Sequence, residues 1–225
     1  MSNTFQDFKT YMDSYIREEE KLSESDREDF ITEAVEEFSR FTPDIDVADL
    51  TGDGSAVEFD LPSGFDVNFS TIISIEFPVG EQDPVYLKPS EYMVYRTLTE
   101  NQIRLKEITL GSAETARMTF TRVHVVDEDS STISDSSWKA VATLATSKAA
   151  RALATQYANS RDSIRNNLVN NERRADSYSA LADKLEKSYY RALGIDPDSL
   201  PPAYSTFDID PEMQFGAGPI THSRR

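Results

Sequence analysis

The most regular hydrophobic pattern of the chain runs through residues 137–159. Apolar and small side chains recur there at steps of three and four residues, which is the spacing of one face of an α-helix. These side chains are Trp138, Val141, Ala145, Ala149 and Ala152, with Leu144, Leu153 and Tyr157 beside them. Alanine favours the helical backbone and lets neighbouring helices approach closely. Because this stretch is poor in charge, we expect it to lie at the centre of a helical bundle.

Two amphipathic patterns at the N-terminus predict further helices. Residues 4–22 place aromatic and aliphatic side chains on one face, with Thr4 as the N-cap. Residues 23–41 repeat this pattern, and either Ser23 or Ser25 opens a capping box with the acid three positions later.

After Pro43 the pattern changes from helical to alternating. Residues 44–54 are rich in turn-forming types, and beyond them β-branched and aromatic residues alternate with polar ones, which is typical of strands. The expected strands are 57–61, 71–77, 85–87, 92–96, 102–106 and 117–126. Short strands at this spacing predict a small antiparallel sheet or open barrel inserted between the helices.

Helical periodicity returns in residues 173–193, and Gly194 is expected to end that helix. Residues 160–172 are polar and leave three possibilities open: a helical turn, a short connecting helix or a partly ordered crossover. Residues 195–225 hold five of the ten prolines, which predicts an extended or disordered arm.

These patterns together predict an α+β fold. Two N-terminal and two or three C-terminal helices form a bundle, into which a small antiparallel β-domain is inserted, and an extended C-terminal arm follows. The expected boundaries are 1–45 for the N-terminal helices, 46–133 for the β-rich insert, 134–194 for the C-terminal helices and 195–225 for the arm.

Composition and charge narrow the classes of function. The formal net charge is −17, yet residues 134–194 carry ten basic and six acidic side chains and are the only basic segment. An acidic chain binds nucleic acid poorly, because that affinity comes from cations that release phosphate counterions. The chain has no cysteine, which removes disulfides, thiol nucleophiles and zinc–thiolate sites. The absence of cysteine also fits cytosolic assembly. The sequence has no apolar run of about 18 residues and no signal-peptide pattern, so we expect no membrane contact.

Candidate catalytic and metal-binding patterns are weak. Residues 49–54 resemble the start of a calcium loop, but a strand pattern and a proline follow, which favours a tight turn. Neither His124 nor His222 has a partner at metal-ligand spacing, and His124 is expected to be an ordinary strand residue. The chain has no Gly-x-Ser-x-Gly elbow and no phosphate-binding glycine loop. We therefore expect no catalytic residue, no cofactor and no metal.

The basic segment allows three interpretations. Its cations, among them Lys184, Lys187 and Arg191, could bind phosphates, form a solvated helix face, or contact the acidic N-terminal helices of a neighbouring copy. The candidate residues for an oligomer or partner interface are Arg161, Arg165, Arg173, Arg174, Tyr204, Phe207 and Phe215.

The order and spacing of these features resemble the head–tail connector (adaptor) proteins of tailed bacteriophages, which dock on the portal ring after DNA packaging. The likeness covers residues 28–193, without residues 160–172. It is carried by the segments Phe41–Pro43, Asp49–Gly54, Phe59–Phe65, Ile73–Val79, Glu91–Arg96 and Asn101–Leu105, then by Trp138 with the alanine-rich helix and by the Tyr-rich last helix.

The resemblance implies a virion structural protein of the neck, made in the host cytoplasm. Its partners would be the portal protein, copies of itself in a ring (expected to be a dodecamer), a further neck or tail protein, and double-stranded DNA that passes through the channel without specific binding. Two alternatives stay open: another neck or tail structural protein, such as a head-completion or tail-terminator protein, and a non-virion binding module directed at the host. A hydrolase that depends on His124 ranks last.

Overall fold

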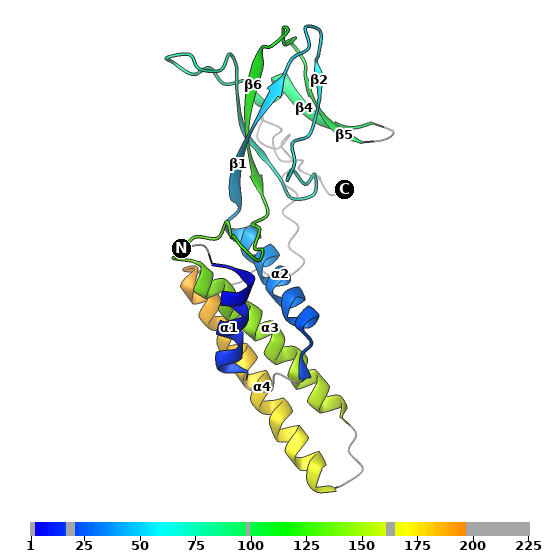
Figure 1. Cartoon of the computed structure of the whole chain (residues 1–225), viewed down its shortest axis with the longest axis vertical. Helices are drawn as coiled ribbons and strands as arrows, with labels where there is room; N and C mark the ends of the chain where they lie inside the picture. The colour runs from blue at the N-terminus through cyan, green and yellow to red at the C-terminus, as the bar shows by residue number, and fades with distance from the viewer. Residues whose placement is uncertain (1–2, 17–20, 98–99, 161–164, 197–225) are drawn as a thin grey trace, which may run out of the picture.

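A computed structural model of the chain describes residues 3–16, 21–97, 100–160 and 165–196. The helices are α1 (Phe5–Tyr15), α2 (Glu24–Phe41), α3 (Trp138–Asn159) and α4 (Arg165–Ala192). They form one end of an elongated molecule, and six strands between α2 and α3 form the other end (Figure 1). The predicted α+β fold, a helical bundle with an inserted antiparallel β unit, is confirmed.

Local side-chain bonds start the first two helices as predicted. The Asp7 carboxylate accepts from the backbone N–H of Thr4 at 2.9 Å before α1. Ser23 and Asp26 form the capping box of α2, in which the Ser23 hydroxyl accepts from the Asp26 N–H at 3.1 Å. Helix α1 ends at Tyr15, so the prediction that it extends to residue 22 is wrong.

Helix α3 is the central element of the bundle, as its alanine-rich stripe predicted. It packs most extensively against α4, while α2 and α1 also lie against it. Ala145 and Ala149 are at most 1% exposed, and the Ser147 hydroxyl donates to the Ala182 carbonyl of α4 at 2.9 Å. Small side chains therefore let α3 and α4 approach at this point.

Helix α4 begins at Arg165, so it includes much of the polar stretch whose structure the sequence left open. It ends at Ala192, and Gly194, two residues later, adopts a positive φ of 73°. The N–H of Ile195 then donates to the Tyr190 carbonyl and that of Gly194 to the Arg191 carbonyl, which is a Schellman motif. The predicted helix stop at glycine is confirmed.

The strands form two three-stranded antiparallel sheets that share one core. The first sheet has the order β1-β6-β3 and the second β2-β5-β4. The strands are β1 (Asp44–Thr51), β2 (Glu58–Asp60), β3 (Ile72–Glu76), β4 (Tyr92–Arg96), β5 (Asn101–Leu105) and β6 (Thr115–Arg122), with the short helix η2 (Pro89–Glu91) before β4. Buried side chains from both sheets meet in a core separate from that of the bundle.

Strand β1 corrects the prediction of a turn-rich segment over residues 44–54. Its acidic side chains are stabilised across the sheet: Arg122 contacts Asp44, and Arg117 contacts Asp49, both at 2.8 Å. Residues 85–87 form only an isolated bridge, between Tyr86 and Glu76, instead of the expected strand. Residues 195 and 196 are the only described part of the expected C-terminal arm.

Candidate functional site

The chain passes between the bundle and the β unit at two places, and His124 lies where these meet. The first passage joins α2 to β1 at Thr42 and Pro43, and the second follows β6. His124 comes two residues after the end of β6 and is 8% exposed. The prediction that it is an ordinary strand residue is wrong.

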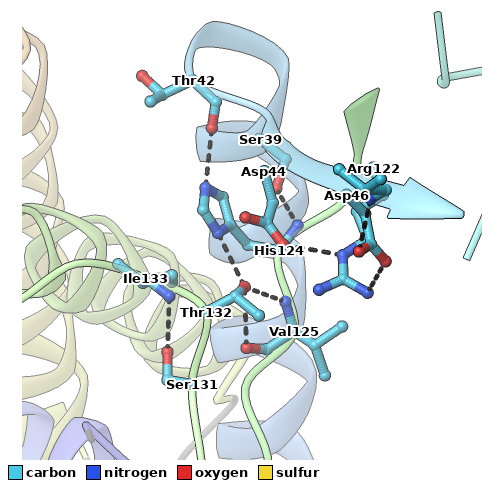
Figure 2. Close-up of polar contacts among 11 residues, drawn as sticks. Ser39, Thr42, Asp44, Asp46, Arg122, His124, Val125, Ser131, Thr132 and Ile133 are labelled. Carbon is cyan, nitrogen blue, oxygen red and sulfur yellow. Dashed lines mark hydrogen bonds and ion pairs between the residues drawn. The ribbon is translucent and has the colours of Figure 1, made fainter. Parts of the chain in front are cut away.

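The imidazole of His124 bonds to both passages (Figure 2). Its Nε2 lies 3.0 Å from the Thr42 carbonyl oxygen and its Nδ1 lies 2.9 Å from the Thr132 hydroxyl. A carbonyl only accepts, so Nε2 carries the proton and donates to Thr42, and Nδ1 accepts from the Thr132 hydroxyl. The backbone N–H of His124 donates to the Ser39 hydroxyl of α2 at 2.9 Å.

Burial lowers the pKa of His124 below its usual value, an effect that outweighs the nearby Asp44 carboxylate. The imidazole is therefore neutral near pH 7 with both nitrogens bonded inside the protein. This arrangement holds segments together, and it leaves neither nitrogen available to a substrate or a metal ion.

An ion-pair cluster lies next to this histidine at the base of the first sheet. The Arg122 guanidinium contacts Asp44 at 2.8 Å through Nε and Asp46 at 2.6 Å through Nη1 (Figure 2). The hydrogen bond to Asp44 raises the pKa of Arg122, so the guanidinium stays charged. The cluster fixes the start of β1 to the end of β6, beside the junction with the bundle.

A shallow cleft of about 170 Å³ borders the junction. Its lining is mostly apolar and comprises Phe5, Thr32, Val35, Glu36 and the segment Val123–Val126. It brings no hydroxyl or carboxylate into a nucleophile–base arrangement with His124, whose nitrogens are occupied. The cleft therefore presents a mainly apolar surface beside the junction.

The residues suggested as a calcium loop form a strand end and a turn. Asp49 belongs to β1 and pairs with Arg117, while Asp53 accepts from the Ser55 N–H at 2.9 Å. The predicted Gly-Asp-Gly turn is confirmed at Gly52–Gly54, whereas Asp49–Thr51 belong to the strand. Among the described residues, no three histidine or carboxylate side chains are grouped as metal ligands. Within the same ranges, no helix combines the length and apolar character needed to cross a bilayer.

The predicted basic interface includes residues of α4. Some cations of this helix face outward, and others are bonded within the chain. Arg173 is exposed, whereas the Arg174 guanidinium donates to the Tyr157 hydroxyl of α3 at 3.2 Å. The backbone of Arg165 begins α4. The other candidate residues lie outside the described part: Arg161, Tyr204, Phe207 and Phe215.

Three further cations of α4 are exposed: Lys184, Lys187 and Arg191. The acids that alternate with them turn toward α3, where Arg151 contacts Asp183 at 3.0 Å and Glu186 at 2.6 Å. Consequently none of the three cations has an ion pair with any residue in the described ranges.

Sequence reasoning missed the set formed by Ser39, His124 and Thr132. Ser39 lies 85 residues before His124, so no local spacing connects them. No protein-family model, curated protein or solved structure matches the chain.

Proposed function

We propose that this chain is a non-enzymatic virion protein of a tailed bacteriophage, a head–tail connector that forms a ring on the portal and links the DNA-filled capsid to the tail. The observation that carries the proposal is the element order: two helices, an antiparallel β unit and two helices, with the β unit at one end of the bundle (Figure 1). This is the layout implied by the resemblance to the connector family.

The segments that carry the resemblance occupy defined places in this layout. Residues 41–43 end α2 and lead into β1, and residues 91–96 and 101–105 include the β4–β5 hairpin. Trp138 begins α3, the central helix. The likeness therefore rests on elements that build the protomer and on the points where they begin and end.

An elongated protomer with two separate cores suits a connector because each end can bind a different partner. The bundle would form the ring scaffold, and the β unit would project toward a further neck or tail protein. The arm 195–225 would dock on the portal. A net charge of −17 would let double-stranded DNA pass without sticking, since like charges repel.

The His124 junction supports a structural role over a hydrolytic one. Both imidazole nitrogens are bonded to the chain itself, so this histidine is not free to act as a general base at the cleft. A connector requires this kind of internal bonding, because the two ends must keep a fixed relation to each other.

The test is native mass spectrometry and electron cryomicroscopy of the chain mixed with the portal protein of the same genome. We expect a ring of copies seated on the portal. A chain that stays monomeric and binds neither portal nor tail proteins would contradict the proposal. Co-purification with tail proteins alone would identify a head-completion or tail-terminator protein, and absence from virions would favour a host-directed module.

A further inference from the structure

The outward faces of α2 and α4 carry opposite charges. Each helix buries its apolar side against α3, which leaves charged side chains on the opposite side. The acidic stripe of α2 consists of Asp29, Glu33 and Glu36, and the basic stripe of α4 consists of Lys184, Lys187 and Arg191; all six are exposed.

Contacts inside the chain leave both stripes largely unneutralised. Lys148 of α3 lies 3.0 Å from Glu37 but 3.7 Å from Glu33, whose side chain is 58% exposed. Asp29 and Glu36 have no ion pair with a residue of the described ranges. The acids of α4 beside the basic stripe are bonded to α3, as described above.

The two stripes match in length. Each extends over seven residue steps, which is about 10 Å at 1.5 Å per residue of α-helix. With the helices parallel, Asp29 lies opposite Lys184 and Glu36 opposite Arg191, while Glu33 and Lys187 differ by one residue step. All three acids can therefore reach a cation at once.

The stripes also lie at the same level along the bundle. Helices α2 and α4 both run toward the β unit (Figure 1), and the Tyr190 hydroxyl donates to Glu37 at 2.9 Å. The C-terminal turns of the two helices are thus side by side. Rotation about an axis along the helices would bring the acidic stripe of one copy level with the basic stripe of the next.

We propose that the acidic stripe of α2 binds the basic stripe of α4 in a second copy of this chain, in a head-to-tail contact. Such a contact uses two different surfaces, so an open assembly has a free acidic stripe at one end and a free basic stripe at the other, and a ring can close when these two meet. The inference rests on the proposed function for ring closure, whereas the contact itself needs only a second copy.

Nucleic acid is the competing partner for the basic stripe. Three cations on a chain of net charge −17 form a weak phosphate site, because binding strength follows the number of phosphates neutralised. The acidic stripe, which matches in length and level, favours a copy of the chain. The experiment includes a DNA arm for this reason.

The absence of native cysteine permits a clean cross-linking test. Glu33→Cys and Lys187→Cys are introduced in separate full-length chains, mixed at about 100 µM and treated with a short thiol-to-thiol cross-linker. We expect heterodimers to form about tenfold faster than in a control mixture where Glu81→Cys, an exposed position in the β unit, replaces Glu33→Cys. High salt should remove this advantage.

Charge reversal tests the chemistry of the contact. Adding Lys184→Glu and Arg191→Glu to the Lys187→Cys chain should slow cross-linking about tenfold, and adding Asp29→Lys and Glu36→Lys to its partner should restore the rate. Because these side chains are exposed, circular dichroism should show unchanged folding.

The proposal is overturned by a rate equal to that of the control mixture, by reversals without effect, or by failure of the double reversal to restore the rate. It is also overturned if Lys184→Glu/Arg191→Glu abolishes binding to a labelled duplex but leaves cross-linking unchanged. If the cross-linking test is negative but the chain forms a ring on the portal, the proposed function stands and the copies contact each other through another surface. If the cross-linking test is positive but the chain does not bind the portal, the contact between copies stands and the proposed function is wrong.

Discussion

At the scale of single residues, Ser39 connects helix α2 to the segment after β6. Its hydroxyl donates to the Val35 carbonyl at 2.7 Å and accepts from the His124 N–H at 2.9 Å, and the residue is fully buried. Ser39→Ala leaves that N–H unsatisfied, so we expect a loss of about 1–3 kcal/mol in the free energy of unfolding. Urea titration measures it.

Ser177→Ala is the matched control for this prediction. The Ser177 hydroxyl also donates to a carbonyl four residues earlier in its helix, but it is exposed and no other group depends on it in the described ranges. We expect a change within about 0.5 kcal/mol. An equal effect of the two substitutions would show that the buried bond to His124 contributes nothing.

His124 predicts how stability depends on pH. Burial holds its folded pKa below the value near 6.5 that it has in the unfolded chain, so the unfolded state binds the proton first. The stability from this residue is therefore complete above about pH 6.5 and falls as the pH drops toward the folded pKa.

The measurement compares urea midpoints at pH 7.5 and pH 5.5 in the native chain and in His124→Gln. The native chain should lose more stability on acidification than the variant, because only the native chain has this proton to gain on unfolding. The carboxylates titrate in both chains and cancel in the comparison. Equal losses would contradict the assigned neutral imidazole.

At the scale of elements, α3 depends on small side chains where the other helices approach. Ala145 and Ala149 are buried, and Ala158 lies on the exposed side of the same helix. Ala145→Leu or Ala149→Leu should overpack the bundle and cost about 1–3 kcal/mol. Thermal melting should show no comparable loss for Ala158→Leu, and equal melting temperatures in all three variants would mean that α3 is not closely packed.

The elements that the sequence predicted well are those whose signals are local. The caps on Thr4 and Ser23, the stripe of α3 and the stop at Gly194 all involve residues within a few positions of one another. Strand β1 was missed because its aspartates resemble turn residues locally. Their partners Arg117 and Arg122 lie 68 and 78 residues away, and only the folded sheet brings them together.

The candidate interface was predictable in part for the same reason. The cations of α4 are visible in the sequence, but the acids among them favoured a solvated helix face. Only the packing of α4 on α3 shows that Arg151 binds Asp183 and Glu186 and leaves Lys184 and Lys187 without ion pairs in the described ranges. Side-chain direction decides this, and sequence spacing does not give it.

At the scale of the whole molecule, the bundle core and the β core are separate, and a small junction lies between them. The bundle core and the β core share no buried residue, and the bonds of His124 join the segments between them. The single tryptophan, Trp138, packs edge-on to Phe8 with ring centroids 6.0 Å apart, inside the bundle. Its fluorescence therefore reports the bundle alone, whereas calorimetry reports both cores.

His124→Ala should separate the unfolding of the two cores. The substitution removes the imidazole bonds to Thr42 and Thr132 and the ring contact with Phe38 at the edge of the bundle core, and it removes no residue of either core. We therefore expect the coupling between the two cores to weaken while each core stays folded. In the native chain we expect the fluorescence and calorimetric transitions to coincide. In the variant the two transition temperatures should differ by about 4–8 °C, the shift that about 1 kcal/mol of lost coupling produces in a unit of this size.

Val125→Ala is the control, because it changes an exposed neighbour of His124, and its fluorescence and calorimetric transitions should still coincide. Coincident transitions in His124→Ala would show that contacts other than those of His124 couple the two cores.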